Sequence, residues 1–117
     1  MGEDCSDDAG ATLRVLTWNV HYGAGSTVEH GRATSRKDTL RWIDVIGSQI
    51  TQWRPDIVAL QEVDRRAFRS HWVDQLSLLR ASTGMCAAWT RTWEAGWVPF
   101  PGLWPGGHTG SVRTGQA

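Results

Sequence analysis

The chain has 117 residues and a mass of 13.0 kDa, and its twelve basic side chains balance twelve acidic ones. A chain of this length forms one small domain, which excludes a two-domain architecture. Because the net charge is zero, no overall field attracts nucleic acid or an anionic membrane, so any phosphate binding must come from a local site.

The amino-terminal residues 1–12 are rich in acidic side chains and lack the basic start and apolar stretch of a secretory signal. No run of eighteen apolar residues predicts a membrane-spanning helix. We therefore expect an acidic flexible tail over 1–12, a folded part over 13–117 and a cytoplasmic location. The two cysteines, Cys5 and Cys86, form neither a disulfide framework nor a zinc site, and we expect free thiols.

The first predicted elements are a strand, a loop and a helix. Residues 13–20 alternate between two faces and end with the polar Asn19, which indicates a strand. Residues 21–35 have glycines and hydroxyl side chains without a period, as loops do. Over 36–53 the apolar side chains recur every three or four residues, which predicts an amphipathic helix that ends before Pro55.

A second strand, a second helix and a third strand follow. The run 56–60 is almost continuously apolar, which predicts a strand covered on both faces. Ser70 is expected to cap a helix over 71–83 that stops at Gly84. Residues 86–93 suit a third strand. The segment from Gly96 onward is rich in Trp, Pro and Gly, and we expect it to be a loop.

The order strand, helix, strand, helix, strand predicts an α/β domain. If the first two strands are parallel neighbours, their carboxyl ends meet at one edge and bring Asn19 and Glu62 together. A carboxylate there suits a hard divalent ion such as Mg²⁺, which takes one or two protein carboxylates and substrate phosphate. The amide of Asn19 can bind water or a phosphoryl oxygen without adding charge.

A purely structural interpretation stays open for the same two residues. Glu62 can cap a turn or pair with Arg65 or Arg66, and Asn19 can bind nearby backbone groups, as such residues often do at strand ends.

Two stretches carry a resemblance to a known family. Thr17-Trp-Asn-Val-His-Tyr-Gly23 and, after a helix, Pro55-Asp-Ile-Val-Ala-Leu-Gln-Glu-Val-Asp64 resemble the two amino-terminal motifs of the endonuclease/exonuclease/phosphatase superfamily. The resemblance implies a Mg²⁺-dependent phosphoesterase, with Mn²⁺ as an alternative ion, and the amino-terminal half of a DNase I-like four-layer α/β sandwich. It implies that Glu62 binds the metal and that Asn19 is a catalytic residue that orients phosphate and water.

The family's later motifs, of the types His-x-Asp, Gly-Asp-x-Asn and Ser-Asp-His, are absent from the 117 residues. The water-activating Asp and its His partner are therefore missing, and we expect 13–117 to be a partial domain that is inactive alone. A complementing carboxyl-terminal fragment is the expected partner, and without its sheet an uncovered face predicts poor solubility. Nucleic acid, phospholipid and inositol phosphate all stay open as substrates, so nuclease and phosphodiesterase activities are both included.

Two further residues are weaker candidates for contacts to substrate or phosphate. His21 follows Asn19 at the presumed site, and Arg65 follows Glu62 with a planar guanidinium that suits phosphate. A plain loop role for His21 and a solvated ion pair for Arg65 are the alternatives. A different function also stays open, a non-catalytic βαβ binding or interaction module that uses tryptophans of the Pro-rich loop.

Overall fold

The computed structural model describes residues 10, 12–25, 28–29, 32–33, 35–101 and 108–117. Nearly all of the expected acidic tail over 1–12, with Cys5, lies outside the described residues, and so does Trp104, one of the tryptophans of the expected Pro-rich loop. In chain order the elements are β1 (Val15–Asn19), the 3-10 helix η1 (His21–Gly23), β2 (Val28–Glu29), β3 (Arg32–Ala33), α1 (Arg36–Trp53), β4 (Ile57–Gln61), β5 (Val63–Asp64), the 3-10 helix η2 (Phe68–Ser70), α2 (Gln75–Thr83), β6 (Thr90–Pro101) and β7 (His108–Gln116).

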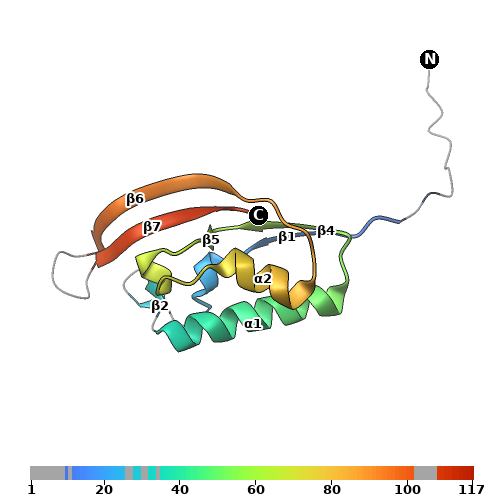
Figure 1. Ribbon diagram of the computed structural model, residues 1–117, viewed down its shortest axis with the longest axis horizontal. Coiled ribbons are helices and arrows are strands. Elements are labelled where there is room, and N and C mark those ends of the chain that lie inside the picture. Colours follow the sequence, from blue (N-terminus) through green and yellow to red (C-terminus); the bar gives the residue numbers. More distant parts are fainter. Residues whose placement is uncertain (1–9, 11, 26–27, 30–31, 34, 102–107) are drawn as a thin grey trace, which may run out of the picture.

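Strands β1 and β4 are parallel neighbours, as the sequence predicts. Their register sets Asn19 beside Gln61, so the residue after Gln61 lies next to the end of β1. Helices α1 and α2 cover one side of this sheet (Figure 1). In the same view the hairpin of β6 and β7 lies above α2. The predicted α/β fold class is confirmed.

Helix α1 spans the residues that the periodicity predicts. Ser35 caps its amino terminus, where the Ser35 hydroxyl accepts the backbone N–H of Asp38 at 3.0 Å. At the other end Arg54 is the C-cap, with left-handed dihedral angles, and its backbone N–H donates to the carbonyl of Ile50.

The main core lies between the two helices and the sheet. Its buried members come from the residue after β1 and from α1, β4, β5 and α2, and they are Val20, Ile43, Ile46, Ile50, Leu60, Val63, Leu76 and Leu79. Leu16, Trp18 and Val58 pack against this cluster from the same face of the sheet. Burial of such side chains contributes roughly 1.5 to 3 kcal/mol each relative to exposure.

The opposite face of the β1–β4 sheet is open. Val15 and Ile57 are 62% and 49% exposed, and Thr17 and Ala59 are also exposed. The prediction that 56–60 is covered on both faces is therefore wrong for the described residues, because helices pack on one side of β4 only. This open face is consistent with the expectation of an uncovered sheet.

The second helix begins later than predicted. Asp74, not Ser70, is the N-cap, and its carboxylate accepts the backbone N–H of Ser77 at 3.2 Å. The chain cannot be helical from His71, because His71 and Trp72 have positive φ angles. Ser70 instead ends η2, and its hydroxyl donates to Asp64. Gly84 does stop the helix, with a φ of +71°.

The Trp/Pro/Gly segment is the largest difference from the sequence prediction. Strand β6 continues from Thr90 through Gly96 to Pro101 and pairs antiparallel with β7 (His108–Gln116), so the expectation of a loop from Gly96 onward is wrong for residues 96–101 and 108–116. Strand order β5-β7-β6 makes β6 an edge strand, where proline is tolerated because no neighbour needs its missing N–H. Breaks in the register around Val98 absorb the irregular backbone.

Candidate metal and phosphate site

A β-bulge presents Glu62 at the end of β4. Val63 pairs with Gly115 on β7, whereas Leu60 exchanges two backbone hydrogen bonds with Ala117. Two residues, Gln61 and Glu62, therefore lie opposite the single Gln116. The extra residue bends the strand, and Glu62 has a φ of +57°. The bulge turns the Glu62 side chain away from the ordinary alternation of the strand.

Glu62 and Asn19 are in contact, as the parallel pairing predicts. Nδ2 of Asn19 donates to Oε1 of Glu62 at 3.0 Å. Oδ1 of Asn19 accepts the backbone N–H of His21 at 2.9 Å. Because a backbone N–H can only donate, this second bond fixes which end of the amide is oxygen and directs the NH₂ group to the carboxylate. The structural interpretation of Asn19 is thus partly right, since the amide also binds local backbone.

The next residues extend the parallel ladder past β1 to the bulge. The backbone N–H of Val20 donates to the carbonyl of Gln61 at 3.0 Å, and that of Tyr22 donates to the carbonyl of Glu62 at 2.9 Å. His21 lies between them with positive φ, exposed, and its ring contacts the Tyr22 ring at 4.6 Å between centroids. His21 therefore lies at the rim of the site, and its phosphate contact stays a prediction.

A buried polar network supports the site from beneath. Asp64 is fully buried and accepts two hydrogen bonds from Arg69, at 2.8 and 2.9 Å, and one from Ser70 at 2.9 Å. Buried Gln75 accepts the backbone N–H of Asp64 and donates to the carbonyl of Tyr22. The network joins β5, η2 and α2 to the loop that follows Asn19, so it holds that loop in position.

Tyr22 interacts with the buried polar network and with the carboxylates of Glu62 and Asp64. Its ring is buried, and the guanidinium of Arg69 lies 3.8 Å from its centroid. Burial raises the pKa of the Tyr22 hydroxyl, the positive charge of Arg69 opposes that rise, and the charges of Glu62 and Asp64 add to it. The balance of these influences is a raised pKa, which favours the protonated phenol.

Arg65, the other predicted phosphate contact, is engaged elsewhere. It forms a two-point ion pair with Asp74, with distances of 3.0 and 3.3 Å, and its guanidinium lies 5.5 Å from the Trp89 ring centroid. The Asp74 carboxylate raises the pKa of Arg65. The ion-pair alternative is thus confirmed in kind, although the partner is Asp74. Binding of phosphate by Arg65 stays a prediction.

Sequence reasoning missed the supporting residues Arg69 and Gln75. Neither follows a strand directly, and nothing in their spacing distinguishes them from surface polar residues. The one available signal was Asp64, a carboxylate close to an apolar strand, which must find donors when buried.

Comparison with known proteins identifies the family. The family model described as Endonuclease/Exonuclease/phosphatase family matches residues 16–117. The chain belongs to this family. No curated protein and no solved structure matches it.

Family membership shows a phosphoesterase-type domain and a hydrolase in general, and the α/β fold fits part of a DNase I-like domain. Within the described residues, no helix is long and apolar enough to cross a membrane. The family match begins inside β1 and includes both site motifs, so Asn19 and Glu62 lie in the matched region.

Proposed function

We propose that this domain is the amino-terminal portion of a Mg²⁺-dependent phosphoesterase in which Glu62 binds the metal and Asn19 orients phosphate. The observation that carries the proposal is the 3.0 Å contact between these two side chains at one rim of the sheet. Mn²⁺ suits the same oxygen ligands. The substrate class is a phosphate mono- or diester, and a bound divalent ion would neutralise charge on its phosphoryl oxygens.

The charges around Glu62 fit a divalent cation. Glu62 is half-buried, and among the residues that the structure describes it forms no ion pair, so only the neutral Asn19 amide balances its carboxylate. No group of three or more acidic, His or Cys side chains gathers in the described part of the chain. Mg²⁺ needs no such cage, because it keeps several waters and takes one or two carboxylates.

Asn19 supports the proposal through its fixed orientation. The His21 N–H holds Oδ1, so the NH₂ group points to the space beside the carboxylate and can donate its second hydrogen to a phosphoryl oxygen. The buried Tyr22 lies close enough to Glu62 for this carboxylate to contribute to the raised pKa of its hydroxyl. These groups bind and orient phosphate. None of them is a base for water, and we propose that the 117 residues alone do not turn over substrate.

Calorimetric titration with MgCl₂ tests the metal assignment. Glu62→Gln keeps the side-chain shape and the amide contact but removes the charge, so we expect Mg²⁺ binding to be lost. The exposed carboxylate of Asp44 on α1 provides the control, and Asp44→Asn should bind as the wild type does. Equal affinity of the wild type and Glu62→Gln would contradict the assignment.

A second assay tests the absence of turnover. Hydrolysis of bis(p-nitrophenyl) phosphate by the wild-type chain with Mg²⁺ should equal that by Glu62→Gln. Turnover that depends on Glu62 would refute the proposed inactivity while it supported the metal site.

A further inference from the structure

A cleft lies between the β6–β7 hairpin and the segment that joins β5 to α2. Its volume is about 640 Å³, which is within the range of small-ligand pockets. None of its lining residues belongs to the Asn19–Glu62 site, so the cleft is a separate feature of the molecule. The lining residues that bear on a ligand are Arg66, Trp72, Glu94, Ser111 and Arg113.

Two of these side chains lie where the backbone conformation favours glycine. Arg66 and Trp72 have φ angles of +57° and +62°. Bulky residues rarely adopt such angles, and residues that do so gather at ligand sites. The Trp72 ring meets that of Phe68 nearly at right angles, with 6.2 Å between centroids, yet stays 57% exposed. Burial therefore does not explain a tryptophan at this position, whereas a flat ligand that stacks on the indole does.

The charges of the cleft favour an anion. Glu94 accepts hydrogen bonds from Arg113, at 2.8 Å, and from Arg91, so two cations neutralise its carboxylate. Arg66 is exposed and has no ion pair and no side-chain hydrogen bond among the residues that the structure describes. An unpaired guanidinium suits phosphate, which it can bind through two parallel N–H groups.

A buried hydroxyl in the wall of the cleft also lacks a partner. Oγ of Ser111 is shielded from solvent and forms no hydrogen bond within the described part of the chain. Buried polar atoms are nearly always paired, so each exception calls for an explanation. A polar ligand in the cleft would supply a partner for this hydroxyl.

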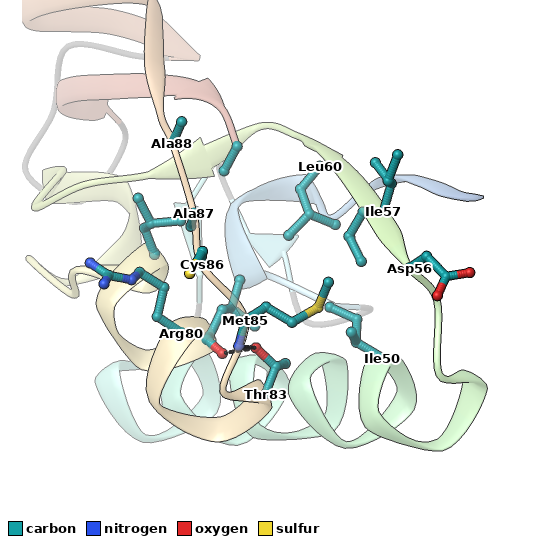
Figure 2. A pocket seen from close by; sticks show the side chains of 14 residues that line it. Ile50, Asp56, Ile57, Leu60, Arg80, Thr83, Met85, Cys86, Ala87 and Ala88 are labelled. Atoms are coloured by element: carbon teal, nitrogen blue, oxygen red, sulfur yellow. Dashed lines mark hydrogen bonds between the residues drawn. The ribbon is translucent and has the colours of Figure 1, made fainter. Parts of the chain in front are cut away.

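The cavity of about 340 Å³ beside β4 has a different chemistry. Figure 2 shows Ile50, Leu60 and Met85 between Arg80 at one margin and Asp56 at the other. No aromatic side chain of the described residues lines this cavity, so it offers no surface for stacking. The exposed Arg80 therefore provides a control for Arg66.

We propose that the cleft binds one nucleotide, with the base stacked on the Trp72 indole and the phosphate paired with Arg66. A nucleotide combines the flat face and the anionic group that the lining residues require. Inositol phosphates and phospholipid headgroups carry phosphate but have no flat face. The site needs no metal ion, and it does not rest on the function proposed for Glu62.

An NMR titration of the chain with AMP in the presence of EDTA tests the site without divalent ions. The indole N–H signal of Trp72 and the amide signal of Ser111 should shift. Adenosine lacks the phosphate and ribose 5-phosphate lacks the base, so each should bind about tenfold more weakly or less. Glu62→Gln should bind AMP as the wild type does, which separates this result from the metal assignment.

Two results of this titration would overturn the proposal. One is AMP that shifts none of the cleft signals. The other is ribose 5-phosphate that binds as tightly as AMP, because Trp72 would then have no part in binding. A single-stranded oligoadenylate distinguishes the source of the nucleotide. Tighter binding than AMP would indicate a nucleic acid strand and equal binding a free nucleotide, and both would support the site.

Matched variants assign the contacts. Trp72→Leu and Arg66→Gln should each weaken AMP binding by about tenfold or more. Trp53→Leu and Arg80→Gln, at exposed positions outside the cleft, should leave it unchanged. Arg66→Gly relieves the positive φ, so Tm should hold or rise while AMP binding weakens. A lower Tm with unchanged AMP affinity in Arg66→Gly would show that Arg66 is structural and would overturn the proposal.

Discussion

Glu62 and Asp64 are carboxylates two residues apart, yet the fold treats them in opposite ways. Asp64 is fully buried and accepts three side-chain hydrogen bonds, two of them from Arg69. Glu62 lies at a bulge, half-buried, with one neutral partner. The comparison teaches that a carboxylate whose bonds are all made within the protein holds structure, whereas one left with spare acceptors at a rim is available to a ligand.

The largest expected loss of unfolding free energy follows substitution of Asp64. Asp64→Asn leaves Arg69, whose side chain is only 11% exposed, without a counter-charge. Removing one member of a buried ion pair costs about 3 to 5 kcal/mol. We expect a loss of unfolding free energy of this size in urea denaturation. A loss below about 1 kcal/mol, the size typical of an exposed pair, would contradict the structural role.

Gln75 should show the next largest effect. Gln75→Leu fills the same space but leaves the Asp64 N–H and the Tyr22 carbonyl unsatisfied. Each unsatisfied buried group costs about 1 to 3 kcal/mol. Urea denaturation should show such a loss, and amide exchange around Tyr22 should accelerate because the loop is released. Unchanged exchange at Tyr22 would mean that Gln75 does not hold the loop.

Asp74 should show a smaller effect that depends on pH. Burial raises its pKa, but the hydrogen bonds from Arg65 and Ser77 outweigh burial and leave the pKa lowered. A carboxyl with a lowered pKa in the folded state stabilises above its unfolded pKa, and this contribution is lost as the pH falls through the folded pKa. We expect acid to reduce the stability gap between the wild type and Asp74→Asn.

The matched variants at this position separate the cap from the charge. Asp74→Ala should cost about 1 kcal/mol more than Asp74→Asn, because asparagine still caps α2. Urea midpoints measured from pH 7 down to acid provide both comparisons. An Asp74→Asn deficit that persists at low pH would show that the ion pair is not its cause.

The smallest effect on stability is expected at Glu62. Glu62→Gln keeps an acceptor for Nδ2 of Asn19 and removes a charge that no cation neutralises among the described residues. We expect the unfolding free energy to change by less than about 0.5 kcal/mol. Thermal unfolding of this variant beside Asp64→Asn measures the contrast directly. A similar loss in both variants would remove the distinction between the two carboxylates.

Much of this arrangement follows from local sequence rules. The periodicity over 36–53 predicts α1 at its observed bounds, and parallel pairing across it predicts the contact of Asn19 with Glu62. The helix prediction depends on short-range sequence periodicity, and the predicted contact depends on one crossover between parallel strands.

The remaining features depend on tertiary contacts. Ser70 looks like a helix cap, but Asp64 takes its hydroxyl once η2 packs against β5. Proline in β6 argues against a strand unless the strand is known to lie at an edge. Similarly, the bulge at Glu62 is visible only when the pairing of β7 with both β4 and β5 is known. Pattern alone does not specify such pairings.

The central claim is that Glu62 and Asn19 form one site for a divalent ion and phosphate. Its most direct test is an NMR titration of the chain with MgCl₂ that follows the side-chain NH₂ signals of Asn19. We predict that these signals shift with Mg²⁺ in the wild type and in Asp44→Asn, and stay in place in Glu62→Gln. Asn19 signals that ignore Mg²⁺ in the wild type, or that shift equally in Glu62→Gln, would contradict the claim.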